Sequence, residues 1–325
     1  MIKVEWFYWL LGAVFLAGAV ITVRDRTNPK RYGSAAFWAL VGLSFPYATF
    51  VSAKTAPPWV LGLAVIAMTV LVGARRLGRG TTEASTAEEK SASATRFGNK
   101  LFVPPLVIPL VAVIFAAVLA KIHFGGRPLL ESGSESLIGL GVASVLAVVV
   151  ALIMLRPKSV AAPLSDGHRL LEALGWSAIL PQMLAILGQL FTDAGVGRAV
   201  GTVIGNVLPA GSLIGSVAVY CVGMALFTVI MGNAFAAFPI MTAAIGYPVL
   251  VAHFHGNPAV VFAIGMLSGF CGTLCTPMAA NFNLVPVALL DMKSRYTTIR
   301  AQIPTAIPLL ICNVVLMYVL AFGVL

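Results

Sequence analysis

Charged residues are scarce in this 325-residue sequence, at 10% of the chain, whereas soluble domains contain roughly 25%. Hydrophobic residues make up 59%, above the roughly 45–50% of soluble domains. This composition excludes an ordinary soluble protein and predicts an integral membrane protein with many spans. Because the apolar runs are continuous and do not alternate with polar residues, we expect helices and not the strands of a barrel.

Acidic residues number only 11. Three of them fall near the C-terminal apolar part, at expected segment ends: Glu172, Asp193 and Asp291. No carboxylate is therefore expected at mid-membrane, where many proton pumps carry one. The sequence also has no phosphate-binding loop, no dinucleotide-binding glycine motif and no helix with a zinc-binding histidine pair. Without a nucleophile and base pair at membrane depth, a membrane-embedded enzyme is the less favoured class, and we expect no enzymatic activity.

Cysteine is also rare, with four residues that all lie in apolar segments, so a disulfide framework is not expected. Cys271 and Cys275 would share one helix face, but two thiols alone seldom form a metal site, and close helix packing explains them better. His253 and His255 lie at the boundary of a span and are interpreted as loop histidines, with a proton-sensing or ligand-binding role as the alternative. We expect no metal and no cofactor.

About ten membrane segments fit this chain, because one helical span needs about 20 apolar residues. We predict an all-α polytopic membrane protein in three parts. These are an N-terminal three-helix membrane unit (residues 1–74), a charged, flexible cytoplasmic linker (residues 75–100) and a C-terminal membrane transport body (residues 101–325). The linker is predicted to be flexible because its Thr, Glu, Ala and Ser residues offer little apolar surface to bury.

The net charge of +10 is explained by the positive-inside rule and does not indicate nucleic-acid binding. The loops after the first, third and fifth predicted segments contain 13 Lys and Arg residues, against four in the N-terminal tail and the loops after the second and fourth. This asymmetry predicts a multi-pass protein of the bacterial inner membrane, with both termini outside.

Residues 170–196 are apolar but interrupted near their centre by Pro181 and Gln182. Two interpretations remain open. One is a spanning helix that is kinked at the proline. The other is a re-entrant hairpin that enters from the inside and returns, in which Pro181 and Gln182 would contribute to a binding site.

Two later runs place Gly, Pro, Asn and Thr inside apolar sequence: MGNAFAAFP at residues 231–239 and SGFCGTLCTPMAANFN at residues 268–283. In hydrocarbon, an unpaired backbone amide costs several kcal/mol, so broken helices are tolerated only where protein or a water-filled cavity supplies partners. Such interruptions are typical of the binding sites of secondary transporters. The two runs are therefore predicted to be broken helices that share a site.

The candidate substrate-binding or ion-binding residues in these two runs are Gly232, Asn233, Thr273, Thr276, Pro277, Asn281 and Asn283. Free N–H groups at half-helix N-termini favour an anion, and unwound carbonyls can coordinate Na⁺. The alternative is that these polar side chains only satisfy the backbone groups that Gly and Pro leave unpaired.

The motifs at residues 231–239, 265–273 (GMLSGFCGT) and 276–283 (TPMAANFN) resemble a bacterial membrane family of unknown function, number 979. The resemblance implies one subunit of a two-component 5-oxoproline (pyroglutamate) transporter, with a second membrane subunit of family 969 as its partner. It further implies the ion transporter superfamily, whose members contain a re-entrant hairpin and a broken helix in each inverted repeat and move their substrate by an elevator-like shift. On that basis the partner would supply the second repeat.

We therefore expect a permease subunit that carries a small carboxylate, coupled to Na⁺ or H⁺. The alternatives are a scaffold subunit that does not contact the substrate and, less favoured, a membrane-embedded enzyme.

Overall fold

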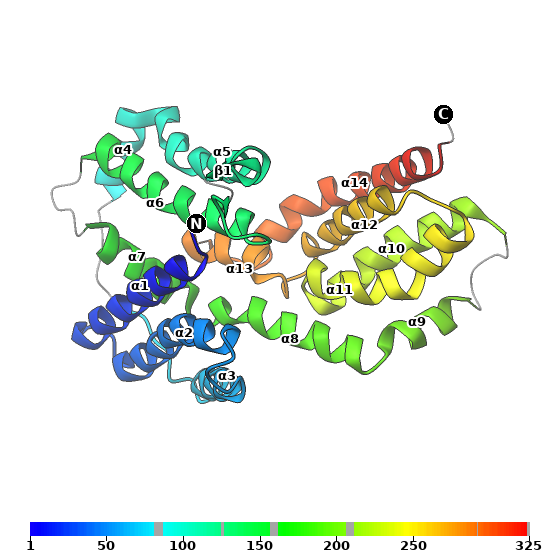
Figure 1. Ribbon diagram of the computed structural model, residues 1–325. Coiled ribbons are helices and arrows are strands. Elements are labelled where there is room, and N and C mark those ends of the chain that lie inside the picture. The colour runs from blue at the N-terminus through cyan, green and yellow to red at the C-terminus, as the bar shows by residue number, and fades with distance from the viewer. Residues whose placement is uncertain (81–86, 125–126, 157–161, 206–210, 291, 324–325) are drawn as a thin grey trace. The chain divides into compact units, whose positions relative to one another are not determined.

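The computed structural model describes the chain apart from residues 81–86, 125–126, 157–161, 206–210, 291 and 324–325, and what it describes is almost entirely helical (Figure 1). The chain forms two compact units, Met1–Gly175 and Trp176–Leu325. The boundaries predicted at residues 74 and 100 both lie inside the first unit, and the three-part division of the chain remains a prediction.

The first unit is built on two packed helix pairs, α1 with α2 and α5 with α6. Its helices are α1 (Glu5–Arg24), α2 (Arg31–Ser52), α3 (Trp59–Gly73), α4 (Ala87–Phe97), α5 (Val103–Ala117), α6 (Glu135–Leu155) and α7 (Ala162–Leu174), with 3₁₀ turns η1 (Gly98–Phe102) and η2 (Leu119–Lys121). Strands β1 (His123–Phe124) and β2 (Arg127–Pro128) form a short antiparallel ribbon. Small residues allow α1 and α2 to approach closely, since a Cβ added at Gly12 would lie 2.8 Å from the ring of Pro46.

The second unit packs its helices around α10 and α12. Its elements are η3 (Gly175–Ile179), α8 (Leu180–Asp193), α9 (Val196–Gly205), α10 (Leu213–Met231), α11 (Ala234–Met241), the π-helix η4 (Thr242–His253), α12 (Pro258–Thr273), α13 (Ala280–Leu289) and α14 (Thr297–Phe322). Its core contains fully buried Tyr220, Met224 and Met317, among other apolar side chains.

Seven helices in the described part of the chain are long and apolar enough to cross a membrane, which indicates a multi-pass membrane protein. They are Glu5–Arg24, Arg31–Ser52, Ser91–Lys121, Glu135–Leu155, Leu213–Met231, Ala234–His253 and Thr297–Phe322. Trp59–Gly73 and Pro258–Thr273 are apolar but shorter. The sequence-based count of about ten segments, which includes half-crossings, remains a prediction.

The predicted linker begins with an ordered segment and not with free chain. Gly78 lies against the α1–α2 loop, where its carbonyl accepts from Asn28 Nδ2 at 3.1 Å and its N–H donates to Ser34 Oγ at 2.9 Å. Residues 81–86 lie outside the described residues, and residues 87–97 form α4. The first residues of this stretch are ordered because backbone groups, and not apolar side chains, hold them.

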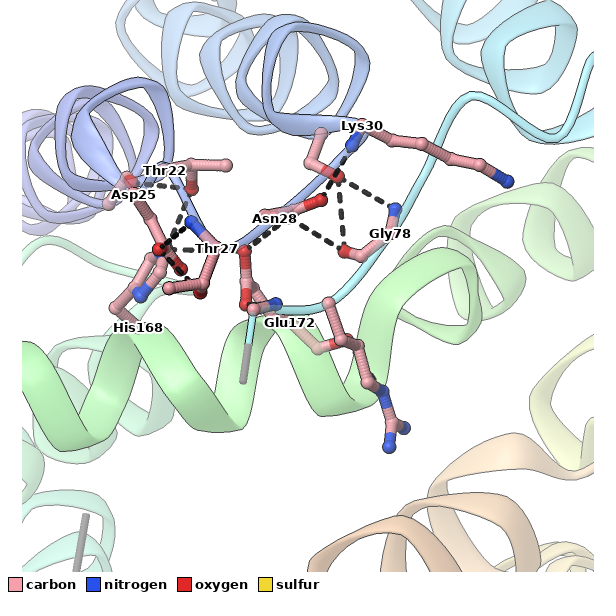
Figure 2. A network of polar contacts seen from close by, with 12 residues as sticks. Thr22, Asp25, Thr27, Asn28, Lys30, Gly78, His168 and Glu172 are labelled. Atoms are coloured by element: carbon pink, nitrogen blue, oxygen red, sulfur yellow. Dashed lines mark hydrogen bonds and ion pairs between the residues drawn. The ribbon is translucent and has the colours of Figure 1, made fainter. Parts of the chain in front are cut away.

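A buried polar network joins this segment to α7 (Figure 2). The carboxylate of Glu172 accepts from Asn28 Nδ2 at 2.7 Å and from the N–H of Gly80 at 2.8 Å. His168 Nε2 lies 3.6 Å from Glu172 Oε1 and 2.8 Å from Thr22 Oγ1. A buried carboxylate is tolerated only where donors replace its water, and Asn28 and Gly80 supply them from two separate stretches of sequence outside α7. The network therefore holds α7 against the α1–α2 loop.

Candidate functional site

The first helix break separates α10 from α11. Gly232 ends α10 in the left-handed region, with φ of 73°, and its N–H donates to the carbonyl of Thr228 at 2.6 Å. Asn233 then begins α11, since its side-chain oxygen accepts from the N–H of Phe235 at 2.8 Å. Glycine is favoured at a left-handed C-terminal position because it has no Cβ, and asparagine is a preferred N-terminal cap. Gly-Asn thus ends one helix and starts the next.

The second break separates α12 from α13, and the side chain of Asn283 spans it. Its Nδ2 donates to the carbonyl of Thr273 at 2.8 Å and to that of Thr276 at 2.6 Å. These carbonyls lie at and beyond the end of α12, where a helix leaves carbonyls without an intrahelical partner. The three side chains are buried, at 0%, 2% and 3% exposure for Asn283, Thr273 and Thr276. Pro277 between them is exposed.

The two breaks lie directly against each other. A Cβ added at Gly232 would lie 2.5 Å from the Cβ of Met278 and 2.9 Å from its carbonyl oxygen. One turn before the end of α12, a Cβ at Gly269 would lie 3.1 Å from the Cβ of Ala234 and 3.3 Å from Thr228 Oγ1. The structure therefore brings together the two runs that the sequence predicts to share a site.

Two buried oxygen atoms in this region have no hydrogen-bond partner among the described residues. They are Asn283 Oδ1 and Thr228 Oγ1, and both side chains have an exposure of 0%. Leaving such a group unpaired costs about 1–3 kcal/mol. Both atoms are neutral oxygens of the kind that hard cations bind.

The helix ends give the region a second electrostatic feature. The C-terminal ends of α10 and α12 bring carbonyl groups to the two breaks, and the N-terminal ends of α11 and α13 bring N–H groups. Helix C-termini carry partial negative charge and N-termini partial positive charge. The arrangement can offer oxygen ligands to a cation and N–H donors to an anion within one region.

The remaining candidate residues add no described side chain to the cluster formed by the two breaks, which contains Thr228, Gly232, Asn233, Thr273, Thr276 and Asn283. Asn281 lies in the first turn of α13 and Pro181 in the first turn of α8, and both side chains lie outside what the structure describes. Gln182 is exposed on α8. The predicted hairpin at residues 170–196 is divided between α7 of the first unit and α8 of the second, so the choice between hairpin and kinked span stays open.

The helices α8 and α9 pack along α11 and η4 and run parallel to them, with glycines at the contacts. The pairs are Gly188 with Ala236, Gly197 with Ile240 and Gly201 with Ala244. The glycines let the backbones approach closely, as small residues do in membrane helix packing. α8 thus covers α11, and α9 covers the end of α11 and the start of η4. Because α8 and α9 run along the same surface one after the other, they do not form a hairpin with each other.

The sequence interpretation missed two residues of the cluster. Thr228 lies one turn before the first break, and Thr298 at the start of α14 donates from Oγ1 to the backbone carbonyl of Asn283 at 3.0 Å. Thr228 could have been found from its position one helical turn before Gly232, which places it on the same side of α10 as the break. The sequence around Thr298 gives no comparable indication that it contacts Asn283. Among the described residues, no group of three His, Cys, Asp or Glu side chains could hold a metal ion.

Comparison with known proteins gives one match. A family model described as "Protein of unknown function (DUF979)" matches residues 5–322. No curated protein and no solved structure matches the chain.

Proposed function

The chain belongs to the DUF979 family, and we propose that it is one subunit of a secondary active transporter for a small organic anion. The family description names no activity, so the proposal rests on the site. Its support is the direct contact between the two helix breaks, together with two buried oxygens, Asn283 Oδ1 and Thr228 Oγ1, that have no partner among the described residues.

The position of the breaks within the second unit supports a transport role. The helix Ala234–His253, which begins at the first break, is 50% buried, whereas Ser91–Lys121 is only 6% buried. Irregular backbone is tolerated at membrane depth where protein encloses it or where it lines a cavity. Interrupted helices of this kind hold the substrate and coupling ion of many secondary transporters.

The proposed roles follow from the chemistry of the helix ends. The N-termini of α11 and α13 would attract the carboxylate of the substrate, and Asn233 would add amide donors beside them. The oxygens of Asn283 and Thr228 and the carbonyls of the breaks would bind Na⁺, with H⁺ coupling as the alternative. We propose 5-oxoproline as the first substrate to test, because the family resemblance implies it and it carries the carboxylate that these helix ends would attract.

Further parts of the proposal come from the expectations of the sequence: the partner and the movement from the family resemblance, and the orientation from the distribution of Lys and Arg. The chain would work with a second membrane subunit of family 969, in the bacterial inner membrane, with both of its own termini outside. Transport would follow an elevator-like movement. The chain would have no enzymatic activity and no resident cofactor.

Uptake by the two-subunit complex in lipid vesicles tests the transport proposal. Labelled 5-oxoproline and a panel of other small carboxylates are offered under an inward sodium gradient, an inward proton gradient or neither. We expect one gradient to drive accumulation of at least one carboxylate. Absence of uptake under both gradients for every carboxylate would contradict the proposal.

A single substitution distinguishes a transporting subunit from a scaffold. Thr228→Val keeps the shape of the side chain and removes only the hydroxyl, which has no partner in the described part of the chain. A transport role predicts lower uptake or a weaker ion dependence in a variant that is at least as stable as the wild type, because an unpaired buried hydroxyl is removed. A scaffold role is favoured by the use of Asn233 and Asn283 to satisfy backbone groups, and it predicts no change in uptake. Thr202→Val, on an exposed face of α9, is the matched control.

A further inference from the structure

An apolar groove lies along the α1–α2 pair of the first unit. Its volume is about 340 Å³, and four of its eight lining residues are alanine. It runs from Leu16 and Ala39 toward Val23 and Tyr32, the ends of the two helices that the α1–α2 loop connects. The alanines leave the groove open because they carry a single methyl group where larger side chains would fill the seam. Val20 on its wall is half exposed, so the groove is open to the surroundings.

The loop end of the groove carries positive charge. The guanidinium carbon of Arg31 lies 4.8 Å from the centre of the Tyr32 ring, and its Nη2 donates to the Tyr32 hydroxyl at 3.0 Å. Arg24 is the last residue of α1 and directly follows Val23 in the groove wall. At least one cation is therefore held at the mouth by contact with a lining residue.

A second basic segment, far away in the sequence, lies beside this loop. The backbone of Arg76 lies against Gly33 so closely that no Cβ would fit there. The contacts of Gly78 with Asn28 and Ser34 fix the rest of the segment to the same loop. The seven basic residues of the two segments are Arg24, Arg26, Lys30, Arg31, Arg75, Arg76 and Arg79.

The acidic side chains nearby do not cancel this charge. Asp25 accepts hydrogen bonds from the N–H and hydroxyl of Thr27, at 2.9 and 2.6 Å. Glu172 is buried and engaged by Asn28 and Gly80. Figure 2 shows the Lys30 side chain extending away from this network. The two segments, residues 24–31 and 75–80, thus carry seven basic side chains and one acidic one, Asp25.

We propose that this groove is a binding site for an anionic phospholipid. One acyl chain would lie in the alanine groove between α1 and α2, and the phosphate of the headgroup would lie among Arg24, Arg31 and Arg76. A groove that joins a hydrocarbon wall to a cluster of cations matches a molecule that joins an acyl chain to a negative headgroup. Basic residues next to membrane helices bind anionic lipids in this way. The site is independent of the proposed transport function.

Thermal unfolding of the full chain in neutral detergent tests the proposal, with phosphatidylglycerol or phosphatidylcholine of the same acyl composition added. We expect phosphatidylglycerol to raise the unfolding temperature more than phosphatidylcholine, and more phosphatidylglycerol to remain bound in native mass spectrometry. Arg31→Gln should weaken phosphatidylglycerol binding about fivefold, the usual effect of one cation near an anionic surface. Arg198→Gln, a change of an exposed arginine in the second unit, should have no effect.

A groove-filling variant tests the acyl-chain part of the proposal. Ala36 is an exposed wall residue, so Ala36→Phe should block the groove without disturbing the core, and it should abolish the difference between the two lipids. Val113→Phe, at a 63% exposed position of α5, is the control. Three results would overturn the proposal: equal stabilisation by the two lipids, an unchanged lipid effect in Ala36→Phe, or the same stabilisation by inorganic phosphate alone.

Discussion

Replacing Asn283 with alanine should destabilise the second unit strongly. The side chain donates two hydrogen bonds, to the carbonyls of Thr273 and Thr276, from a fully buried position. Alanine removes both donors and supplies nothing in their place. A buried polar group left unpaired costs about 1–3 kcal/mol. Two carbonyls are affected, but Thr276 O also accepts from the N–H of Ala279 at 3.3 Å, so we expect a total loss of about 2–4 kcal/mol.

Asn313→Ala is the matched control for this change. Asn313 is also a buried asparagine of the second unit, at 7% exposure, but the one partner of its Nδ2 among the described residues is the sulfur of Cys271, at 3.7 Å. Sulfur is a weak acceptor, so this variant should lose clearly less stability. The two substitutions delete the same atoms from the same kind of side chain, and only the partners differ.

Equilibrium unfolding of the purified chain in mixed micelles gives the two free-energy differences. Uptake by the two-subunit complex, measured on the same variants, shows whether closure of the break matters for transport. If Asn283→Ala is no more destabilising than Asn313→Ala, the Asn283 side chain does not hold the second break together, and the reasoning fails.

Three further outcomes are expected. Gly232→Ala should destabilise the chain more than Gly323→Ala in the same unfolding assay, because both residues have positive φ but only the first has a neighbour in the space of the new Cβ. Glu172→Leu should cost about 2–5 kcal/mol, since it leaves buried donors unpaired, and limited proteolysis should then cut the chain near α7. The Thr27 hydroxyl, as the largest cause, lowers the pKa of Asp25 below its usual 3.8. The ionised carboxylate therefore adds stability that is present above pH 3.8 and lost as pH falls through the lowered pKa, so Thr27→Ala should be less stable than wild type at pH 5 and the difference should shrink toward pH 3.

Much of the fold could be predicted because its causes are local. Long apolar runs form helices in a membrane since every backbone group must be paired within its own segment. The break at Gly232 and Asn233 could be located for a similar reason, because positive φ and N-terminal capping depend on one or two residues. The pairing of the two breaks was also predicted, but only from their shared composition.

Long-range contacts could not be predicted in the same way. The carboxylate of Glu172 was interpreted as a residue at a segment end, but it is buried by Asn28 and Gly80, which lie 144 and 92 residues earlier in the chain. Their sequence pattern gives no sign of this partnership. The contacts of the first linker residues are of the same kind, because the partners of Gly78 and Gly80 are Asn28, Ser34 and Glu172, in other parts of the chain.

The sequence by itself determined the membrane class of this protein, the position of its apolar helices and the two places where those helices break, because composition and backbone chemistry act over a few residues. Only the tertiary structure decided that Gly232 lies against Met278, that Asn283 closes the second break, and that two basic segments meet at the mouth of one groove. Those facts depend on which surfaces fit together. Packing and buried hydrogen bonds depend on which residues are in contact, and the order of residues in the sequence does not show which distant residues these are.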